Sequence, residues 1–245
     1  MRLNQEQIDQ FNRDGYVFMP ECFSRDEAAL LRREADVVYA QDREEVWREK
    51  DGSTPRTAFA AHLYNEAFRR LGAHPRLIEP VEQLLDGKLY MHQYKVNAKA
   101  AFDGDVWQWH QDFGTWHRDD GMPEPRAMNI AVFLDEVTEF NGPLMFIPGS
   151  HRDGVFEAGH DLQSTSYPLW TLDKAKISRY SGAKGACRQR HRLPRLPGPR
   201  LQPEYLTLGP DHRLPEPLRG FEPHHQVPAR RLDRAPRFYS DPGAG

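Results

Sequence analysis

The chain has 245 residues, a length that suits one domain or one domain with an appendage. Its net charge is −3, from 33 basic and 36 acidic residues. This near balance gives no electrostatic case for binding nucleic acid or an anionic membrane surface. The two cysteines, Cys22 and Cys187, cannot build a disulfide framework or a thiolate metal cage, which fits a reducing compartment. Because the N-terminus is polar and no apolar run approaches the roughly 20 residues of a membrane span, we expect a cytoplasmic protein.

The first third of the chain predicts helices. Ser24, followed three residues later by Glu27, is a capping-box signature for the start of one of them. The segment DGYVFMP, residues 14–20, begins with a turn signal and predicts a short strand. Four helices are predicted, over residues 4–13, 25–49, about 62–71 and 74–85.

From Lys88 the hydrophobic pattern changes to a period of two, which is typical of strands. A polar loop is expected around residues 118–125. Strands are predicted in KLYMHQYKVNAKA (88–100), VWQWHQD (106–112), RAMNIAVFLDEV (126–137) and PLMFIPGS (143–150). Helices followed by short strands with turn punctuation predict an α+β protein built on a β-sandwich or barrel.

His110-Gln111-Asp112 is the feature that carries chemistry. In an extended segment, residues i and i+2 face the same side, so His110 and Asp112 can point into one pocket. An imidazole and a carboxylate, with a second histidine from a distant strand, make the facial triad that leaves three positions open on Fe(II). A turn histidine beside a capping aspartate is the alternative explanation of the spacing. Nearby Trp107, Trp109 and Trp116 are either ordinary core or the walls of a dry pocket.

Residues 90–151, from YMHQYKVNAKA through WHQDFGTWHRDDGMP to FIPGSH, resemble the core of the phytanoyl-CoA dioxygenase superfamily. Within it, the chain is similar to the branch of ectoine hydroxylases and free L-proline trans-4-hydroxylases. EQIDQFNRDGYVFMPECFS is similar to the usual N-terminus of this family, so the resemblance covers about residues 4–182. It implies a double-stranded β-helix (jelly-roll, cupin-like) core with N-terminal flanking helices, and Fe(II) and 2-oxoglutarate as cofactor and co-substrate.

The resemblance also implies roles for individual residues. His110 and Asp112 match the first two iron ligands. The positions that line the 2-oxoglutarate and substrate pocket match Gln93, Asn97, Trp116 and Lys99. Two of these have simpler alternatives, since Asn97 could bond its own backbone at a strand end and Lys99 could be a solvated edge lysine. Ser150 and His151, at the end of a turn, are interpreted as structural.

An intact carboxylate at Asp112 favours hydroxylation, because halogenases of this class carry a small residue there to admit halide. The implied substrates, besides O2, are small and amino-acid-like, such as proline or ectoine. Gly114 departs from the ectoine signature, where an acidic residue is usual, and this weakens ectoine as the substrate. An acyl-CoA is disfavoured because no basic cluster for its phosphates stands out. The oligomeric state is not readable from the sequence.

The sequence changes character at Cys187. Residues 187–245 hold 11 of the 20 prolines, 11 arginines, no isoleucine and one valine, which predicts disorder. We therefore divide the chain into an incomplete dioxygenase domain, 1–186, and an aberrant tail with the last strands missing or disordered. No second iron-binding histidine or 2-oxoglutarate-binding arginine is recognisable in the tail, although it contains histidines at 191, 212, 224 and 225. We hypothesise that the tail is the family's C-terminus read in a shifted frame, which would leave this polypeptide inactive.

Two other functions stay open. A non-catalytic remnant or binding protein of the same fold would keep the architecture without the chemistry. A metal-dependent cupin enzyme that needs no 2-oxoglutarate is disfavoured, because such enzymes rely on extra histidines that this sequence lacks. Titration with Fe(II) and 2-oxoglutarate separates the first alternative from a hydroxylase.

Overall fold

The computed structural model describes residues 1–99, 108–137, 144–161, 169–178, 184–185, 200–201 and 204–210. The helices in these residues are α1 (Gln5–Asp14), α2 (Arg25–Tyr39), α3 (Ala61–Tyr64), α4 (Glu66–Gly72), α5 (Pro75–Leu85), α6 (Asp112–Asp119), the 3-10 turn η1 (Ser150–Arg152) and α7 (Lys174–Ile177). The strands are β1 (Val46–Arg48), β2 (Pro55–Phe59), β3 (Leu89–Lys99), β4 (Met128–Val132), β5 (Met145–Phe146), β6 (Ala158–Asp161), β7 (Leu169–Leu172), β8 (Lys184–Gly185), β9 (Arg200–Leu201) and β10 (Glu204–Pro210).

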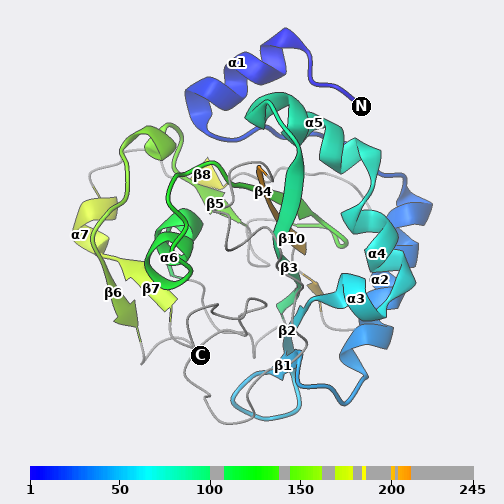
Figure 1. The fold of residues 1–245 in the computed structure, drawn as a ribbon. Helices are drawn as coiled ribbons and strands as arrows, with labels where there is room; N and C mark the ends of the chain where they lie inside the picture. Colours follow the sequence, from blue (N-terminus) through cyan, green and yellow to red (C-terminus); the bar gives the residue numbers. More distant parts are fainter. Residues whose placement is uncertain are drawn as a thin grey trace, which may run out of the picture.

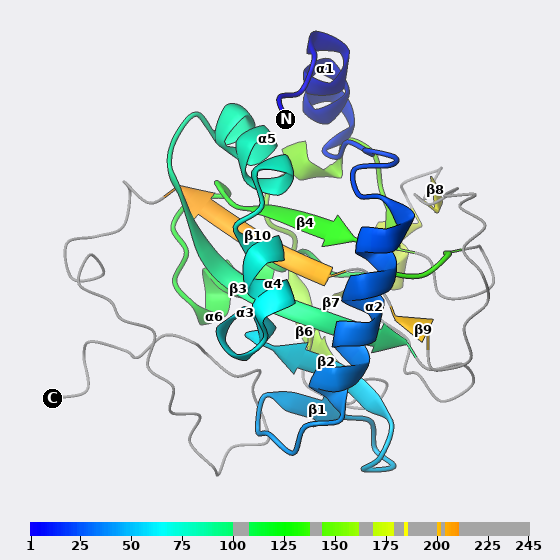
Figure 2. The same ribbon diagram turned by 90° about the vertical axis from the view of Figure 1, so that its right-hand side faces the viewer.

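One antiparallel sheet organises the molecule. Its strand order is β1-β2-β3-β10-β4, and β9 pairs with the C-terminal end of β3. Two small antiparallel sheets, β5-β8 and β6-β7, lie on the side of α6 (Figure 1). Helices α2 to α5 cover the opposite face of the main sheet, as the view in Figure 2 shows. The main sheet therefore separates a helical layer from the half of the molecule that contains His110 and Asp112.

The hydrophobic core lies between β3 and the covering helices. Along β3, Tyr94, Val96 and Ala98 are buried and pack with apolar residues of α2, α4 and α5. Phe68 of α4 is fully buried, and its carbonyl accepts a hydrogen bond from the Tyr94 hydroxyl at 3.1 Å. Because successive side chains of a strand point to opposite faces, the other set of residues from Gln93 to Lys99 faces α6. A register shift against β10 interrupts the alternation at His92, which also faces α6.

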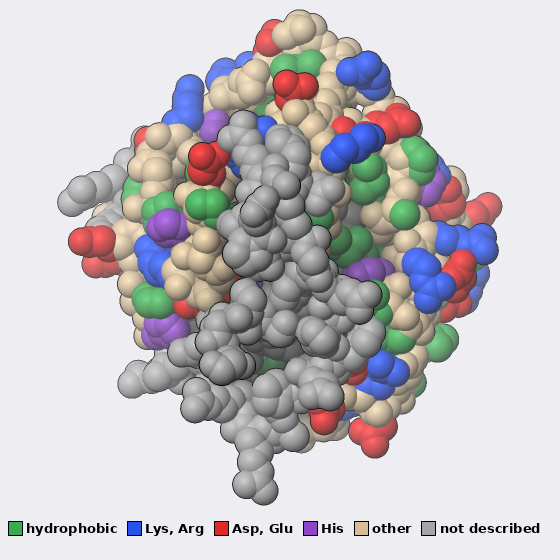
Figure 3. Space-filling view, in the orientation of Figure 1, with side chains coloured by type: hydrophobic (Ala, Val, Ile, Leu, Met, Phe, Trp, Pro, Cys, Tyr) green, Lys and Arg blue, Asp and Glu red, His purple; other side chains and the backbone are tan. Residues whose placement is uncertain are grey.

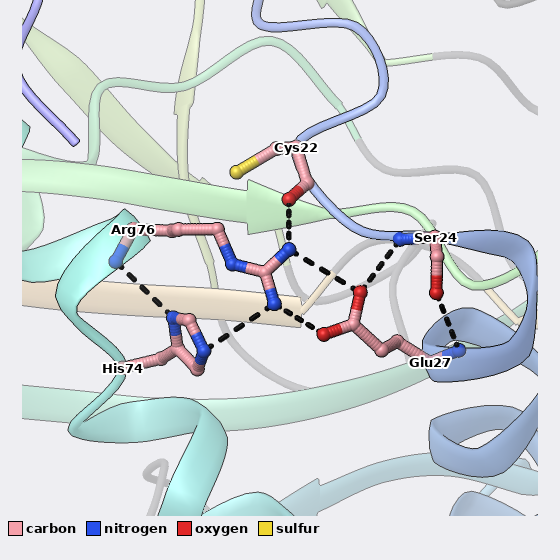
Figure 4. Close-up of polar contacts among 5 residues, drawn as sticks. All are labelled: Cys22, Ser24, Glu27, His74 and Arg76. Atoms are coloured by element: carbon pink, nitrogen blue, oxygen red, sulfur yellow. Dashed lines mark hydrogen bonds and ion pairs between the residues drawn. The ribbon is translucent and has the colours of Figure 1, made fainter.

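A polar cluster joins the start of α2 to the start of α5 (Figure 4). Arg76 donates to the Cys22 carbonyl at 2.6 Å and forms an ion pair with Glu27, and its guanidinium stacks over the Phe23 ring at 4.4 Å. The predicted capping box is confirmed, since the Ser24 hydroxyl accepts from the Glu27 amide at 3.2 Å and the Glu27 carboxylate accepts from the Ser24 amide at 2.7 Å. Glu27 thus caps one helix and fastens it to the next.

Several predicted elements differ from the structure. DGYVFMP forms no strand: Gly15, with φ +83, ends α1 as a left-handed cap, and residues 16–19 pair with none of the described strands. The helix expected over 25–49 stops at Tyr39, and Val46–Arg48 instead pairs with β2 as β1. The loop expected around 118–125 begins later, because α6 continues to Asp119. The long strands predicted at 126–137 and 143–150 are shorter, and only β4 and β5 form ladder pairs there.

The tail also differs from the expectation of missing strands. Two of its segments, β9 and β10, form strands, and β10 pairs with both β3 and β4. The sequence EYLTL in β10 contains Tyr and Thr, which are enriched in strands, and no proline or glycine, within a region otherwise rich in proline and arginine. The rest of the tail, including all four of its histidines, lies outside the described residues.

The α+β class is confirmed, with helices and sheet mixed in one body. Among the described residues, no helix is both long enough and apolar enough to cross a membrane. On the described part of the face shown in Figure 3, acidic and basic side chains are interspersed, which agrees with the small net charge.

Candidate iron centre

The structure brings His110 and Asp112 together. Nε2 of His110 lies 3.4 Å from Oδ1 of Asp112, and the two side chains are 22% and 36% exposed. Two ligands at right angles on one metal ion, each about 2.1 Å from it, lie about 3 Å apart. The observed separation therefore fits two neighbouring ligands of one ion.

The local backbone differs from the predicted strand but achieves the same convergence. Residues 108–111 form no strand, and Asp112 is the first residue of α6. Gln111, between the two candidate ligands, has φ −114 and ψ 121, which is extended backbone. Because this one extended residue separates them, His110 and Asp112 still project to the same side.

The ring of His110 has the tautomer that a metal ligand needs. Its Nδ1 lies 2.6 Å from the carbonyl oxygen of Gln108. A carbonyl only accepts hydrogen bonds, so Nδ1 carries the proton as donor and Nε2 keeps its lone pair in the neutral ring. A backbone carbonyl bonded to the far nitrogen is the usual support of a metal-binding histidine.

Asp112 is held as a carboxylate. Its position in the first turn of α6 is favourable for a negative charge, and Asn129 of β4 donates a hydrogen bond from Nδ2 to Oδ2 at 2.5 Å. Burial raises the pKa of Asp112, but the hydrogen bond and charge of His110 outweigh it and lower the pKa overall. Burial lowers the pKa of His110, but the hydrogen bond and charge of Asp112 raise it on balance. A metal ion would take the place of the proton that this pair shares.

Three of the predicted pocket residues lie on β3. Gln93, Asn97 and Lys99 alternate with the core residues along the strand and therefore share the face toward α6. Asn97 is 1% exposed, and its Oδ1 accepts a hydrogen bond from the Thr57 hydroxyl at 2.9 Å. Its Nδ2 is buried without a hydrogen-bond partner among the described residues. An unpaired buried donor is costly, so a ligand acceptor at this point would satisfy it.

Lys95 is the residue that the sequence prediction missed. It lies between Gln93 and Asn97 in the same alternating set on β3, and its ammonium is 5.8 Å from the Phe59 ring centroid. Burial lowers the pKa of Lys95, and the nearby charges of Asp112 and Asp120 partly offset this. The strand period puts this lysine on the same face as Gln93 and Asn97, and the packing of β3 against α6 brings that face toward Asp112.

Trp116 of α6 packs against the main sheet. It is 5% exposed and packs edge-on against His92 of β3, with ring centroids 5.3 Å apart. His92 in turn approaches Asp120, with 3.3 Å between Nε2 and Oδ2. These contacts attach α6 to the main sheet. A role for Trp116 in lining the ligand pocket stays a prediction, and Trp107 lies outside the described residues.

A cavity of about 140 Å³ lies beside His110. Trp109 and Phe156 line it together with Tyr16 and Phe146, whose rings stack at 5.1 Å. The residues interpreted as structural, Ser150 and His151, also contribute to its wall. Trp109 is therefore the member of the tryptophan group that borders a cavity next to a candidate ligand, as a pocket wall would.

The described residues contain no group of three or more His, Cys, Asp or Glu side chains that could hold a metal ion. The His110–Asp112 pair could supply two donors of a facial triad, and a third protein ligand would have to come from outside the described ranges. The donor types, the tautomer of His110 and the separation of the pair all fit Fe(II).

Comparison with known proteins identifies the class. The profile of the phytanoyl-CoA dioxygenase (PhyH) family matches residues 11–188, well over half of the chain. The chain therefore belongs to the phytanoyl-CoA dioxygenase family, as its motifs predicted. The match ends close to residue 187, where the composition changes.

Individual relatives narrow the resemblance. The chain is 43% identical over 148 residues to an L-proline trans-4-hydroxylase of Streptomyces griseoviridis, covering 60% of this chain and 55% of that protein. It is 39% identical over 154 residues to the ectoine dioxygenase of Halomonas elongata, covering 61% and 46%. The matched stretch thus spans about half the length of these curated relatives.

Solved structures agree on the fold. EctD from S. alaskensis, solved with 2-oxoglutarate and 5-hydroxyectoine, superposes with a TM-score of 0.70 at 27% identity, covering 97% of this chain and 87% of that one. The epimerase SnoN from nogalamycin biosynthesis superposes with a TM-score of 0.54 at 20% identity, covering 84% and 83%, and shows the fold alone.

Proposed function

We propose that this chain has the fold and the iron centre of an Fe(II)- and 2-oxoglutarate-dependent dioxygenase that uses O2 to hydroxylate a small amino-acid-like substrate, and that turnover requires the family's C-terminus in place of the tail as written. The observation that carries the proposal is the convergence of Nε2 of His110 and Oδ1 of Asp112 at 3.4 Å, with His110 in the tautomer for metal binding. The relatives named as a proline hydroxylase and an ectoine dioxygenase supply the reaction and the substrate class. The proposal includes a double-stranded β-helix core, with β5-β8 and β6-β7 as parts of its second sheet.

In this proposal His110 and Asp112 hold the iron, and the third ligand would come from the family's C-terminus, which is not recognisable in the tail as written. Bound Fe(II), with 2-oxoglutarate and O2, supplies the oxidising power for hydroxylation of a C–H bond. The residues of the chain position and shield the reactants. Trp109 and Phe156 make an apolar wall beside His110, which limits access of water to the reacting centre.

The face of β3 toward α6 suits ligands that carry carboxylates. Lys95 provides a cation coupled to Asp112, and Asn97 provides a buried N–H that lacks a described partner. We assign Gln93, Asn97, Lys99 and Trp116 to the 2-oxoglutarate and substrate pocket, as predicted from the sequence. Lys95 joins them as the group that balances the carboxylate of a small zwitterion.

Metal titration tests the proposal. Anaerobic addition of Fe(II) and then 2-oxoglutarate should produce a visible charge-transfer band in the wild-type chain. His110→Ala and Asp112→Ala should each abolish this band. The matched control His117→Ala, at an exposed histidine on α6, should keep it. If the band is absent from the wild type, or survives both substitutions, the proposed iron centre is wrong.

A succinate-release screen over free amino acids and ectoine tests the substrate class. We expect negligible turnover from this exact chain, because the second histidine and the arginine of the family are not recognisable in its tail. A version with the tail restored to the family's frame should turn over. Succinate release by the chain as written, at the rate of a full-length relative, would contradict the expected inactivity.

The second candidate function is a non-catalytic remnant of the same fold. It is favoured by the family match, which ends at residue 188, and by the two-donor pair without a third ligand in the described ranges. A remnant would fold and show no 2-oxoglutarate-dependent colour. The titration above therefore decides between the two candidates.

A further inference from the structure

The two oxygens of Asp112 have different partners. Oδ1 faces Nε2 of His110 at 3.4 Å, and Oδ2 accepts a hydrogen bond from Nδ2 of Asn129 at 2.5 Å. Asp112 begins α6, whereas Asn129 lies on β4, so the contact joins two separate elements. The carboxylate is thus fixed from the side opposite the position that a metal would take.

This arrangement has a consequence for metal binding. A carboxylate can bind an ion through one oxygen or through both. A facial triad keeps three coordination positions open only if its carboxylate binds through a single oxygen. Because Asn129 occupies one lone pair of Oδ2, Oδ1 is the oxygen better placed for a metal beside His110. Fixing the carboxylate also removes rotational freedom that binding would otherwise have to restrict.

We propose that Asn129 is a positioning residue that holds Asp112 as a one-oxygen ligand of the iron. This inference rests on the proposed iron centre of His110 and Asp112. The role differs from a packing role, since Asn129 is exposed and its backbone pairs with Thr207 of β10 whatever side chain it carries. Substitution of an exposed side chain has little effect on stability, so a loss of metal affinity would report on the hydrogen bond itself.

The magnitude follows from the kind of contact. Partners that orient a metal ligand change metal affinity by about 10- to 100-fold when they are removed. The pair here is partly exposed, and water competes for the carboxylate, so the lower end of that range applies. We expect Asn129→Ala to weaken binding about tenfold. Asn129→Ser, which keeps a donor on a shorter arm, should recover part of the affinity.

The test uses Co(II) as the probe, titrated into the full chain under anaerobic conditions. It measures the dissociation constant and the visible ligand-field spectrum, which reports the number of donor atoms. We expect Asn129→Ala to weaken binding about tenfold and to shift the spectrum toward a higher coordination number. The metal-free Asn129→Ala protein should unfold like the metal-free wild type. The control His117→Ala should match the wild type in both unfolding and Co(II) binding.

The outcomes separate this inference from the proposed function. If Asp112→Ala weakens Co(II) binding while Asn129→Ala stays within twofold of wild type, the iron centre stands and the role of Asn129 is wrong. If wild type and Asp112→Ala bind Co(II) equally, both proposals fail. A metal-free Asn129→Ala protein that unfolds much more easily than the wild type would make Asn129 a structural residue and would also overturn the inference.

Discussion

Protonation of His62 should weaken the fold at mildly acidic pH. His62 lies on α3, where its ring is tilted against Tyr94 of β3 with 4.8 Å between centroids. Its Nδ1 is buried without a hydrogen-bond partner among the described residues. Burial, with a smaller contribution from the charge of Arg69, lowers the pKa of His62 to about 4. The folded protein therefore holds this ring in its neutral form through a pH range where the unfolded chain protonates it.

The sign and size follow from linkage. The unfolded pKa is about 6.5, so between that value and about 4 the unfolded state binds more protons than the folded state. The full stability is present above the unfolded pKa and is lost as the pH falls. The loss is at most about 2 kcal/mol by pH 5 and about 3 kcal/mol by pH 4, and it levels off below about pH 3.

Denaturant unfolding followed by tryptophan fluorescence at pH 7, 5 and 4 measures this loss. His62→Phe keeps an aromatic ring against Tyr94 but cannot be protonated, so its free energy of unfolding should fall about 2 kcal/mol less than that of the wild type between pH 7 and pH 5. His117→Gln, at an exposed histidine, should follow the wild type. Equal pH slopes for wild type and His62→Phe would show that burial of His62 does not set the acid sensitivity.

Two further predictions concern the helical layer and the turn after α1. Hydrogen bonds from Arg76, with support from the Ser24 amide, lower the pKa of Glu27 to about 2, so the stability from this contact is present above pH 4.5 and is lost as the pH falls toward 2. Glu27→Gln should remove this pH-dependent part of the free energy of unfolding, which amounts to less than about 1 kcal/mol because the pair is largely solvated. An acid transition identical to that of the wild type would contradict this prediction. Gly15→Ala should cost more than the roughly 1–2 kcal/mol of a left-handed backbone alone, because the new Cβ would overlap the His151 ring. Gly52→Ala, also at positive φ but with open space around it, measures the backbone part, and His151→Ala should partly rescue Gly15→Ala in thermal unfolding; equal losses at both glycines would rule out the overlap.

The local signals in the sequence were strong where short-range chemistry decides structure. The capping box of Ser24 and Glu27 formed as predicted, and the alternating pattern of residues 88–100 became β3. The spacing of His110 and Asp112, with the surrounding motif, predicted both the family and the candidate ligands. These features depend on neighbours a few residues away, so the sequence contains what is needed to predict them.

Other features were decided by long-range packing. The predicted helix over 25–49 ends early because Val46–Arg48 pairs with β2, a partner that no local pattern reveals. The segment EYLTL became a strand because β3 and β4 flank it on both sides. Lys95 entered the candidate site through the orientation of β3 relative to α6, not through a motif of its own.

The sequence by itself determined the class of this protein and predicted two donors of its candidate iron centre, because motif spacing and residue type can be recognised without knowledge of the fold. Only the tertiary structure decided which nitrogen of His110 is free and which oxygen of Asp112 is held by Asn129. Those choices depend on hydrogen bonds whose geometry is set by the meeting of the 108–111 segment, α6 and β4. Contacts between elements distant in the chain follow from packing, which no local pattern encodes.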